Sequence, residues 1–253
     1  MGIGGRSAAL ALVGFVVAAL AHAGDEPVRL QEARPVAPGI AAFPRIVARK
    51  GDTAATRIDR ALEGADASVD GLASDCNHYK GWKRSIDVPM RGPRYLSVIA
   101  RDDWYCGGAY PDTATVALVY DLSTGKPPDW AALLPKDFAV KAGPSPGGGV
   151  SDPVLVASAK LWDLFAKTSE APGDDECNKI RRDPEGLDSR LSVWPDARKG
   201  GIDLAATEFP HVVRACGLPV TIPMAELRKL GFEATLLDAI DEAHAKGWYD
   251  KRK

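Results

Sequence analysis

Alternating apolar and polar positions dominate the middle of the chain and predict three successive β-strands. They cover residues 84–90, 95–100 and 113–120, because a period of two places every second side chain on the same face of a strand. Residues 95–100 are apolar on both faces, which indicates a central strand covered on two sides. In the first strand, the positions predicted to share one buried face are Ile86, Val88 and Met90.

A second pattern, with apolar residues three or four positions apart, predicts helices. Asp152-Pro153 is a strong start signal, since Asp caps a helix and Pro suits its first turn. Gly125 and Gly231 mark a predicted turn and a predicted helix end, where glycine can adopt a positive φ. The predicted helices are a single turn after Asp129 and the segments 53–64, 152–167, 223–230 and 233–246.

Short apolar stretches in the C-terminal half predict further strands. Residues 191–194 and 202–205 should pair around a turn at 198–201. Strands are also predicted at 211–214 and 218–222, a flexible linker at 144–149 and a polar loop at 170–188. Strands interrupted by separate helices, without regular β-α-β alternation, predict an α+β fold with a mainly antiparallel sheet and packed helices.

The N-terminus has the pattern of a secretory signal peptide. Arg6 supplies the positive charge, residues 8–20 the apolar run, and Ala21-His22-Ala23 the cleavage motif. The apolar run of about 13 residues is shorter than the roughly 20 that a membrane-spanning helix needs. We expect a signal peptide over residues 1–23, an extended N-terminal arm over 24–52, and a single α+β domain over 53–253.

Charge narrows the classes of partner. The chain has 32 Lys and Arg residues against 34 Asp and Glu, and removing Arg6 with the signal peptide leaves 31 against 34, or −3. Nucleic acids and anionic membranes bind concentrated basic surfaces, so neither is an expected partner. No later apolar stretch is long enough to span a bilayer, so we expect a soluble periplasmic or secreted protein.

Four cysteines fit this exported location. An even number in an exported chain favours disulfides, although four cysteines allow three pairings. We favour Cys76–Cys106 and Cys177–Cys216, because each bridge then joins neighbouring elements. A zinc site is the alternative, but no two cysteines have C-x-x-C spacing and no histidine lies close to two of them. We therefore expect neither a metal nor a cofactor.

No catalytic motif stands out in the sequence. The serines lack the G-x-S-x-G context of an activated nucleophile. Three histidines follow the signal peptide, none in a metal-binding or general-base motif, and they are His78, His211 and His244. One enzymatic alternative is a hydrolase of envelope carbohydrate or peptidoglycan, which needs carboxylates facing each other across roughly 5–9.5 Å. Its candidate carboxylates are Asp102, Asp103 and Asp112.

Aromatic residues concentrate around Cys106-Gly107-Gly108-Ala109-Tyr110-Pro111, which we name the Gly-Gly corner. Its glycines can let the backbone turn sharply beside a disulfide, between two buried strands. The corner is therefore more informative about the fold than about an activity. If the chain has a recognition surface, we expect it beside this corner, and its candidate binding residues are Tyr105, Gly107, Gly108, Tyr110 and Asp112.

Three motifs between residues 95 and 134 form a recognisable series. They are the Gly-Gly corner, then Tyr120-Asp121-Leu122-Ser123-Thr124-Gly125-Lys126, then Trp130-Ala131-Ala132-Leu133-Leu134. The series resembles an extracytoplasmic domain of unknown function (DUF3298-like) shared by the lysozyme-sensing anti-sigma factor of Bacillus and certain peptidoglycan deacetylases. That family has histidine in its Gly-Gly-Ala-His-Pro corner where this chain has Tyr110, so no His-dependent role is implied.

The resemblance implies a non-catalytic α+β module outside the cytoplasm that recognises other molecules. In the anti-sigma factor this module binds lysozyme. We therefore expect an exported binding module whose partner is a lysozyme-like protein or a cell-wall glycan. Besides the hydrolase, the remaining alternative is a structural subunit of an envelope complex, which would need a large exposed apolar patch.

Overall fold

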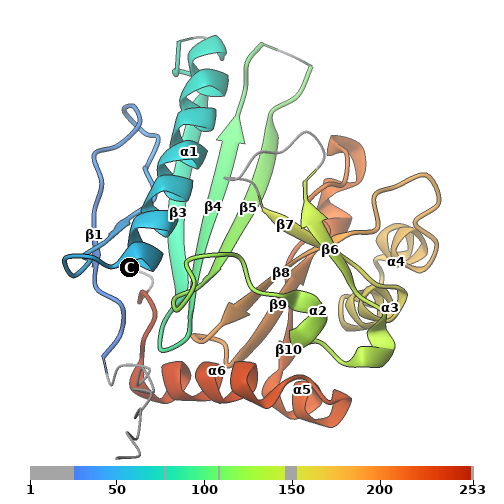
Figure 1. The fold of residues 1–253 in the computed structure, drawn as a ribbon. Coiled ribbons are helices and arrows are strands. Elements are labelled where there is room, and N and C mark those ends of the chain that lie inside the picture. The colour runs from blue at the N-terminus through green and yellow to red at the C-terminus, as the bar shows by residue number, and fades with distance from the viewer. Residues whose placement is uncertain (1–25, 77, 108, 146–152, 252–253) are drawn as a thin grey trace, which may run out of the picture.

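Helices and antiparallel sheets form an α+β fold, as the sequence predicts (Figure 1). The computed structural model describes residues 26–76, 78–107, 109–145 and 153–251; the predicted signal peptide lies outside them. The strands are β1 Leu30–Gln31, β2 Arg45–Ile46, β3 Trp82–Arg91, β4 Tyr95–Trp104, β5 Asp112–Asp121, β6 Lys141–Pro144, β7 Val154–Ala157, β8 Leu191–Asp196, β9 Gly201–Ala205 and β10 Val220–Pro223. The helices are α1 Thr53–Asp75, α2 Trp130–Leu133, α3 Ala159–Thr168, α4 Asp175–Arg182, α5 Met224–Leu230 and α6 Ala234–Lys246, with 3-10 helices η1 Lys136–Phe138 and η2 His211–Gly217. None of these helices has the length and apolar character needed to cross a bilayer.

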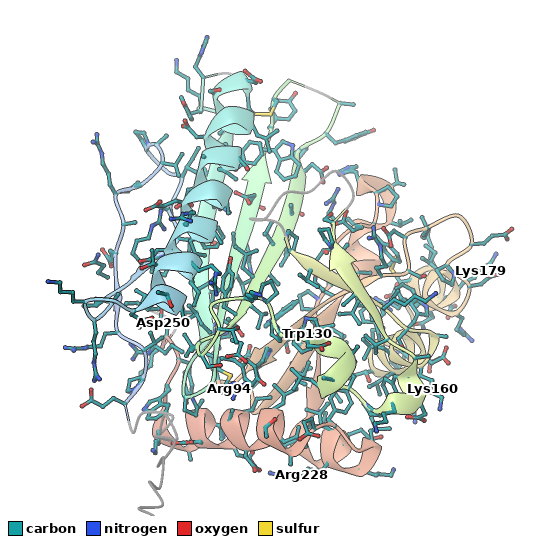
Figure 2. All side chains as sticks on the ribbon, viewed as in Figure 1. Arg94, Trp130, Lys160, Lys179, Arg228 and Asp250 are labelled. Carbon is teal, nitrogen blue, oxygen red and sulfur yellow. A yellow bond between two sulfur atoms is a disulfide. The ribbon has the colours of Figure 1, made fainter. Side chains whose placement is uncertain are left out.

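The three-stranded sheet β3-β4-β5 is covered on both faces, which confirms the prediction for residues 95–100. Leu96 and Val98 pack toward α1, whereas Tyr95 and Ile99 pack on the other face in a core shared with the second sheet. Figure 1 shows α1 along one face of this sheet, and side chains such as Trp130 fill the space beside the other (Figure 2). The continuous apolar pattern of β4 thus follows from its position between two cores.

A β-bulge changes one detail of β3. The register with β4 shifts between Asp87 and Met90, so Val88 packs in the core under α1 and Met90 in the core shared with the second sheet. The prediction that these two residues share a face is therefore wrong. The reason is that the extra residue of a bulge interrupts the period of two.

The five-stranded sheet has the strand order β10-β9-β8-β7-β6 and is antiparallel throughout. Strands β8 and β9 form the predicted hairpin, and every residue of both is buried. Helices α3 and α5 contact β10, while all three strands of the smaller sheet contact β8. The hairpin therefore lies at the centre of the larger core.

Predicted turn and cap signals are confirmed at three positions. Asp129 accepts hydrogen bonds from the first backbone N–H groups of α2, and Gly231 ends α5 with a φ of 83°. Gly125 has a φ of 66°, and a Cβ at this position would lie 2.3 Å from the carbonyl oxygen of Ala54. Gly125 is thus required both for the turn after β5 and for the close approach of α1.

Helix α1 is longer than the predicted helix 53–64. Asp52 caps its start by accepting a hydrogen bond from Ala55 N at 2.9 Å, and the buried face continues to Ala73. The second half gives only a weak helical pattern in the sequence, because most of its buried side chains are small and the contrast between its faces is low. The buried apolar positions are Ala55, Ile58, Ala61, Leu62, Ala65, Val69 and Ala73.

Residues 26–52 run beside α1 and β3 (Figure 1). Their two short strands pair with each other, and Ile40 forms a parallel bridge with Arg84 of β3. Ile40 and Phe43 are fully buried, so this segment contributes apolar side chains to the interior.

A buried group of charged residues joins this segment to α1 and the sheet. Asp66 accepts hydrogen bonds from Phe43 N at 3.1 Å and Arg45 Nη2 at 2.8 Å. The Arg84 side chain is 1% exposed and lies 3.5 Å from carboxylate oxygens of both Asp66 and Asp102, with its guanidinium over the Phe43 ring. Burial lowers the pKa of Arg84 and raises the pKa of Asp102, since both charged forms lose solvation.

The helix predicted for residues 152–167 is wrong in its first part. Residues 154–157 instead form β7, which pairs with β6 and β8. Ser158 is the observed cap, because its Oγ accepts a hydrogen bond from Leu161 N at 3.2 Å. The Val-Leu-Val run of β7 has high strand propensity, and its pairing outweighs the local helix-start signal. Asp152 and most of the predicted linker 144–149 lie outside the described residues.

Two further segments differ from prediction. The loop predicted at 170–188 contains α4, whose acidic first turn and basic last turn suit the helix dipole. The strand predicted at 211–214 is instead part of η2, and the following strand, β10, begins only at Val220. In both places, short segments rich in charge or bounded by proline gave weak periodic signals.

Both favoured disulfides are present. Cys76–Cys106 joins the C-terminal end of α1 to the Gly-Gly corner, and Cys177–Cys216 joins α4 to η2. The described residues include no free cysteine. The bridges therefore fasten two elements, the corner and η2, that contact each other at the candidate site.

Candidate functional site

The Gly-Gly corner connects β4 to β5 at the end of the three-stranded sheet. The Cys76–Cys106 bridge holds it on one side, and Tyr105 N donates a hydrogen bond to Gly81 O at 2.8 Å. A Cβ on Gly81 would lie 2.2 Å from Tyr105 O and 3.0 Å from Cys76 Sγ. The absence of a side chain at Gly81 therefore allows the corner and the disulfide to pack closely, a role that the sequence analysis did not predict.

On its other side the corner meets η2. Asp112 lies 3.1 Å from His211 Nδ1, and its two carboxylate oxygens are 3.0 and 3.1 Å from the Arg214 guanidinium. Tyr110 stacks on His211, with ring centroids 6.0 Å apart and planes 16° from parallel. These contacts join residues that are about a hundred positions apart in sequence.

The environment of Asp112 favours its charged form. Partial burial would raise the pKa of Asp112, but hydrogen bonds from His211 and Thr113 N and the positive charge of Arg214 together lower it below its usual value. The carboxylate thus acts as a fixed negative centre that orients the two η2 side chains.

Large apolar side chains are exposed around this centre. Tyr110 is 73% exposed, Val212 of η2 85% and Leu218 61%. A shallow hollow of about 40 Å³ lies beside them, lined in part by Thr113, Arg214 and Leu218. We name this region the corner surface, and define it as Tyr110, Asp112, His211, Val212, Arg214 and Leu218.

The structure brings together only two of the predicted binding residues. Tyr110 and Asp112 belong to the corner surface, whereas Tyr105 is 51% exposed on the side of the corner that is bonded to Gly81. Gly107 has a φ of 94° with open space around it, so it serves the turn rather than a close contact. Gly108 lies outside the described residues.

The three carboxylates considered for a hydrolase do not form a facing pair. Asp102 is 3% exposed and accepts a hydrogen bond from Trp82 Nε1 at 2.8 Å, so a substrate cannot reach it. Asp103 pairs with Thr113, whereas Asp112 pairs with Trp104. Because successive residues of a strand point to opposite faces, the side chains of Asp103 and Asp112 lie on opposite faces of the sheet. The described residues also include no cluster of His, Cys, Asp or Glu suited to a metal ion.

Sequence reasoning missed the contribution of η2. His211 was interpreted as a strand residue, and Val212, Arg214 and Leu218 were not singled out. Pro210 and Pro219 bracket the segment, and such spacing suits a short tight element better than a strand. That signal indicates a different local structure, but it could not show that the segment packs against β5.

We expect the link between Asp112 and η2 to weaken in acid. Because the pKa of Asp112 is lowered on folding, its contribution to stability is present above the unfolded value, about pH 4, and is lost as pH falls through the folded pKa. Unfolding free energies of wild type and Asp112→Asn should therefore converge below about pH 4. A difference that stays constant down to about pH 2 would contradict this role for Asp112.

No family model matches the sequence, and no curated protein matches it either. Among solved structures, the fold is similar to the crystal structure of a member of the DUF3298 family from Bacteroides fragilis. The two chains have 11% sequence identity and a TM-score of 0.46, over 85% of this chain and 95% of that chain.

Proposed function

We propose that this chain is an exported, non-catalytic binding module that recognises a partner outside the cytoplasm through the corner surface. The observation that carries the proposal is the group of exposed Tyr110, Val212 and Leu218 around Asp112, which forms an ion pair with Arg214 and a hydrogen bond with His211. Exposed apolar groups with a polar rim are typical of interaction sites, and tyrosine and arginine often dominate binding energy.

Two features support a location outside the cytoplasm. The N-terminal segment has the pattern of a signal peptide, and disulfides persist in oxidising surroundings such as the periplasm or the cell exterior. A module in the envelope would meet both cell-wall glycans and lytic enzymes. The resemblance to a lysozyme-binding domain adds the lysozyme-like protein as a partner to test first.

The composition of the corner surface favours a protein partner over a glycan. Val212 and Leu218 are aliphatic and largely exposed, and burying such side chains gains free energy against another apolar surface. A small group of this kind suits a standard or transient interface rather than the large apolar interface of a permanent complex subunit.

The test is binding of the chain from Gly24 onward to lysozymes of several classes and to soluble peptidoglycan fragments, measured by calorimetry. Tyr110→Ala should weaken binding about 10–30-fold, the loss typical of one hot-spot residue. Leu72→Ala is the matched control, since Leu72 is 60% exposed on α1 and should change affinity less than about twofold.

Two outcomes would overturn the proposal. One is the absence of binding to every probe at high micromolar concentration. The other is binding that Tyr110→Ala and Val212→Ala leave unchanged, because the partner would then contact another surface.

A further inference from the structure

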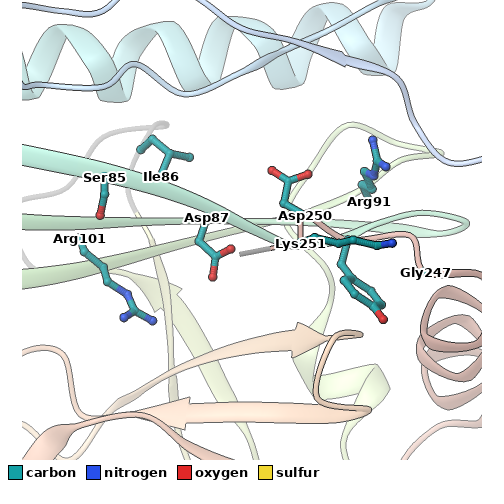
Figure 3. Close-up of a pocket in the computed structure, with 9 residues that line it drawn as sticks. Ser85, Ile86, Asp87, Arg91, Arg101, Gly247, Asp250 and Lys251 are labelled. Carbon is teal, nitrogen blue, oxygen red and sulfur yellow. The ribbon is translucent and has the colours of Figure 1, made fainter. Parts of the chain in front are cut away.

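A groove of about 770 Å³ lies on another part of the molecule, between β3 and the C-terminal segment. Figure 3 shows Arg101 at one end, Arg91 and Lys251 at the other, and Asp87 and Asp250 between them. Its volume falls in the range of ligand-binding clefts. None of its lining residues belongs to the corner surface.

The charges of the groove favour an anionic ligand. Arg198 binds Asp87 through two contacts of 2.9 and 2.7 Å. The charge of Asp87 is therefore compensated by an arginine that does not itself line the groove. Three lining cations, Arg91, Arg101 and Lys251, then remain against Asp250. Unbalanced positive charge in a concave site attracts carboxylates or phosphates.

Arg101 is the best placed of these cations to anchor a ligand. It is exposed on β4 and directly opposite Ser85 of β3, so a guanidinium and a hydroxyl group lie side by side on one face. Within the part of the chain that the structure describes, no carboxylate forms an ion pair with Arg101. An arginine can bind one carboxylate through two parallel hydrogen bonds.

The spacing of the cations points to an extended ligand. Arg91 pairs with Leu96, five positions along β4 from Arg101. At the usual strand rise the two arginine positions are about 17 Å apart, and the odd separation puts their side chains on opposite faces of the sheet, as successive side chains of an extended peptide also alternate. One small anion cannot contact both ends. A peptide of about six extended residues with several carboxylates can.

The edge of β3 favours a peptide as this ligand. Arg84 bonds outward to Gly39 O and Ala41 N, Val88 O accepts from Asp250 N, and Arg91 bonds outward to Val28 N and Trp248 O. The backbone of Ile86, between Arg84 and Val88, also faces outward by strand alternation. Among the described residues, no backbone group pairs with Ile86 on that side. Ile86 lines the groove, so a bound peptide can hydrogen-bond to the edge of β3 at this one residue.

We propose that this groove binds an acidic peptide in extended conformation, with Arg101 and Ser85 holding one carboxylate and Arg91 and Lys251 receiving another. This site is separate from the corner surface and does not depend on the function proposed for it. Ile86 and Tyr249, which also line the groove, contact apolar parts of the bound chain.

The test is calorimetric titration of the chain from Gly24 onward with blocked hexaglutamate at low salt. Hexaglutamate should bind, and the matched hexaglutamine peptide should not. Arg101→Gln should weaken binding about 10–100-fold, the effect of losing a charge-assisted bidentate contact. Lys83→Gln is the matched control, since Lys83 is an exposed cation on β3 outside the groove lining, and it should change affinity less than about threefold.

Four results would overturn the inference. They are no binding of hexaglutamate, equal binding of hexaglutamine, an affinity that Arg101→Gln does not reduce, and free glutamate that binds as tightly as hexaglutamate. Tyr110→Ala should leave hexaglutamate binding unchanged, so failure here is distinguishable from failure of the corner surface.

Discussion

Replacing Asp66 with alanine should lower the free energy of unfolding by about 3–5 kcal/mol, because removing one partner of a buried ion pair leaves the other charge uncompensated. Asp66 is the carboxylate that binds both Phe43 N and Arg45 and lies 3.5 Å from buried Arg84. After the substitution, Arg84 keeps only Asp102 as a counter-ion, and the buried Phe43 N–H loses its acceptor. Urea denaturation of the chain from Gly24 onward measures the change.

The matched control is Glu63→Ala on the same helix. Glu63 is a surface partner of Arg45, at 3.9 Å with a side chain 66% exposed, and such pairs contribute less than about 1 kcal/mol. Asp66→Asn keeps an acceptor for Phe43 N but removes the charge. Its loss of unfolding free energy should therefore lie between those of Asp66→Ala and Glu63→Ala. An Asp66→Ala variant as stable as Glu63→Ala would contradict a structural role for the buried charges.

The same substitution should loosen the N-terminal segment. Asp66 accepts hydrogen bonds from Phe43 and Arg45. Losing these hydrogen bonds should expose residues 26–52 to protease before the protein unfolds globally. Limited proteolysis followed by mass spectrometry should detect earlier cleavage in this segment for Asp66→Ala than for Glu63→Ala. Equal cleavage of the two variants would mean that the segment is held by other contacts.

Removing the Cys177–Cys216 bridge should cost about 4 kcal/mol of stability. The cysteines are 39 residues apart, and the chain-entropy model gives this magnitude for a loop of that length. The bridge fixes η2 against α4, and η2 carries three of the corner-surface residues. The double variant Cys177→Ala/Cys216→Ala should therefore also bind a corner-surface partner more weakly.

The other disulfide supplies a matched comparison. Cys76→Ala/Cys106→Ala opens a loop of 30 residues and should lose a similar free energy of unfolding, about 3.5 kcal/mol. Its effect on binding should be smaller, since this bridge holds the Tyr105 side of the corner rather than η2. A loss below about 1 kcal/mol for the Cys177–Cys216 variant would contradict the expected role of that bridge.

The sequence predicted best those elements whose local pattern and tertiary position agree. Strand β4 alternates between two apolar faces and does lie between two cores. Asp129 and Gly231 are local signals that act within their own helices, so no distant contact was needed to interpret them. The two disulfides followed from chain neighbourhood alone.

Prediction failed where pairing with a distant strand decided the structure. Residues 154–157 follow a helix-start signal, yet β7 forms because it lies between β6 and β8. Met90 changes face because of a bulge that the pairing with β4 reveals. The residues immediately around these two positions do not indicate either the strand conformation of 154–157 or the change of face at Met90.

The candidate site was half predictable for the same reason. Tyr110 and Asp112 follow the Gly-Gly corner in sequence and could be selected by their proximity to it. His211 and Arg214 reach Asp112 across about a hundred residues, and only the packing of η2 against β5 brings them there. A surface assembled from two distant segments requires the fold before it can be recognised.

The central claim is that the corner surface is where this chain contacts its partner. Titration of a lysozyme into the isotopically labelled chain, followed by NMR, tests it most directly because every backbone amide reports its own environment. The claim predicts that the largest shift changes fall at Tyr110, Asp112 and residues 211–218, and that Tyr110→Ala reduces them. Changes confined to other surfaces, or no changes at saturating lysozyme, would contradict it.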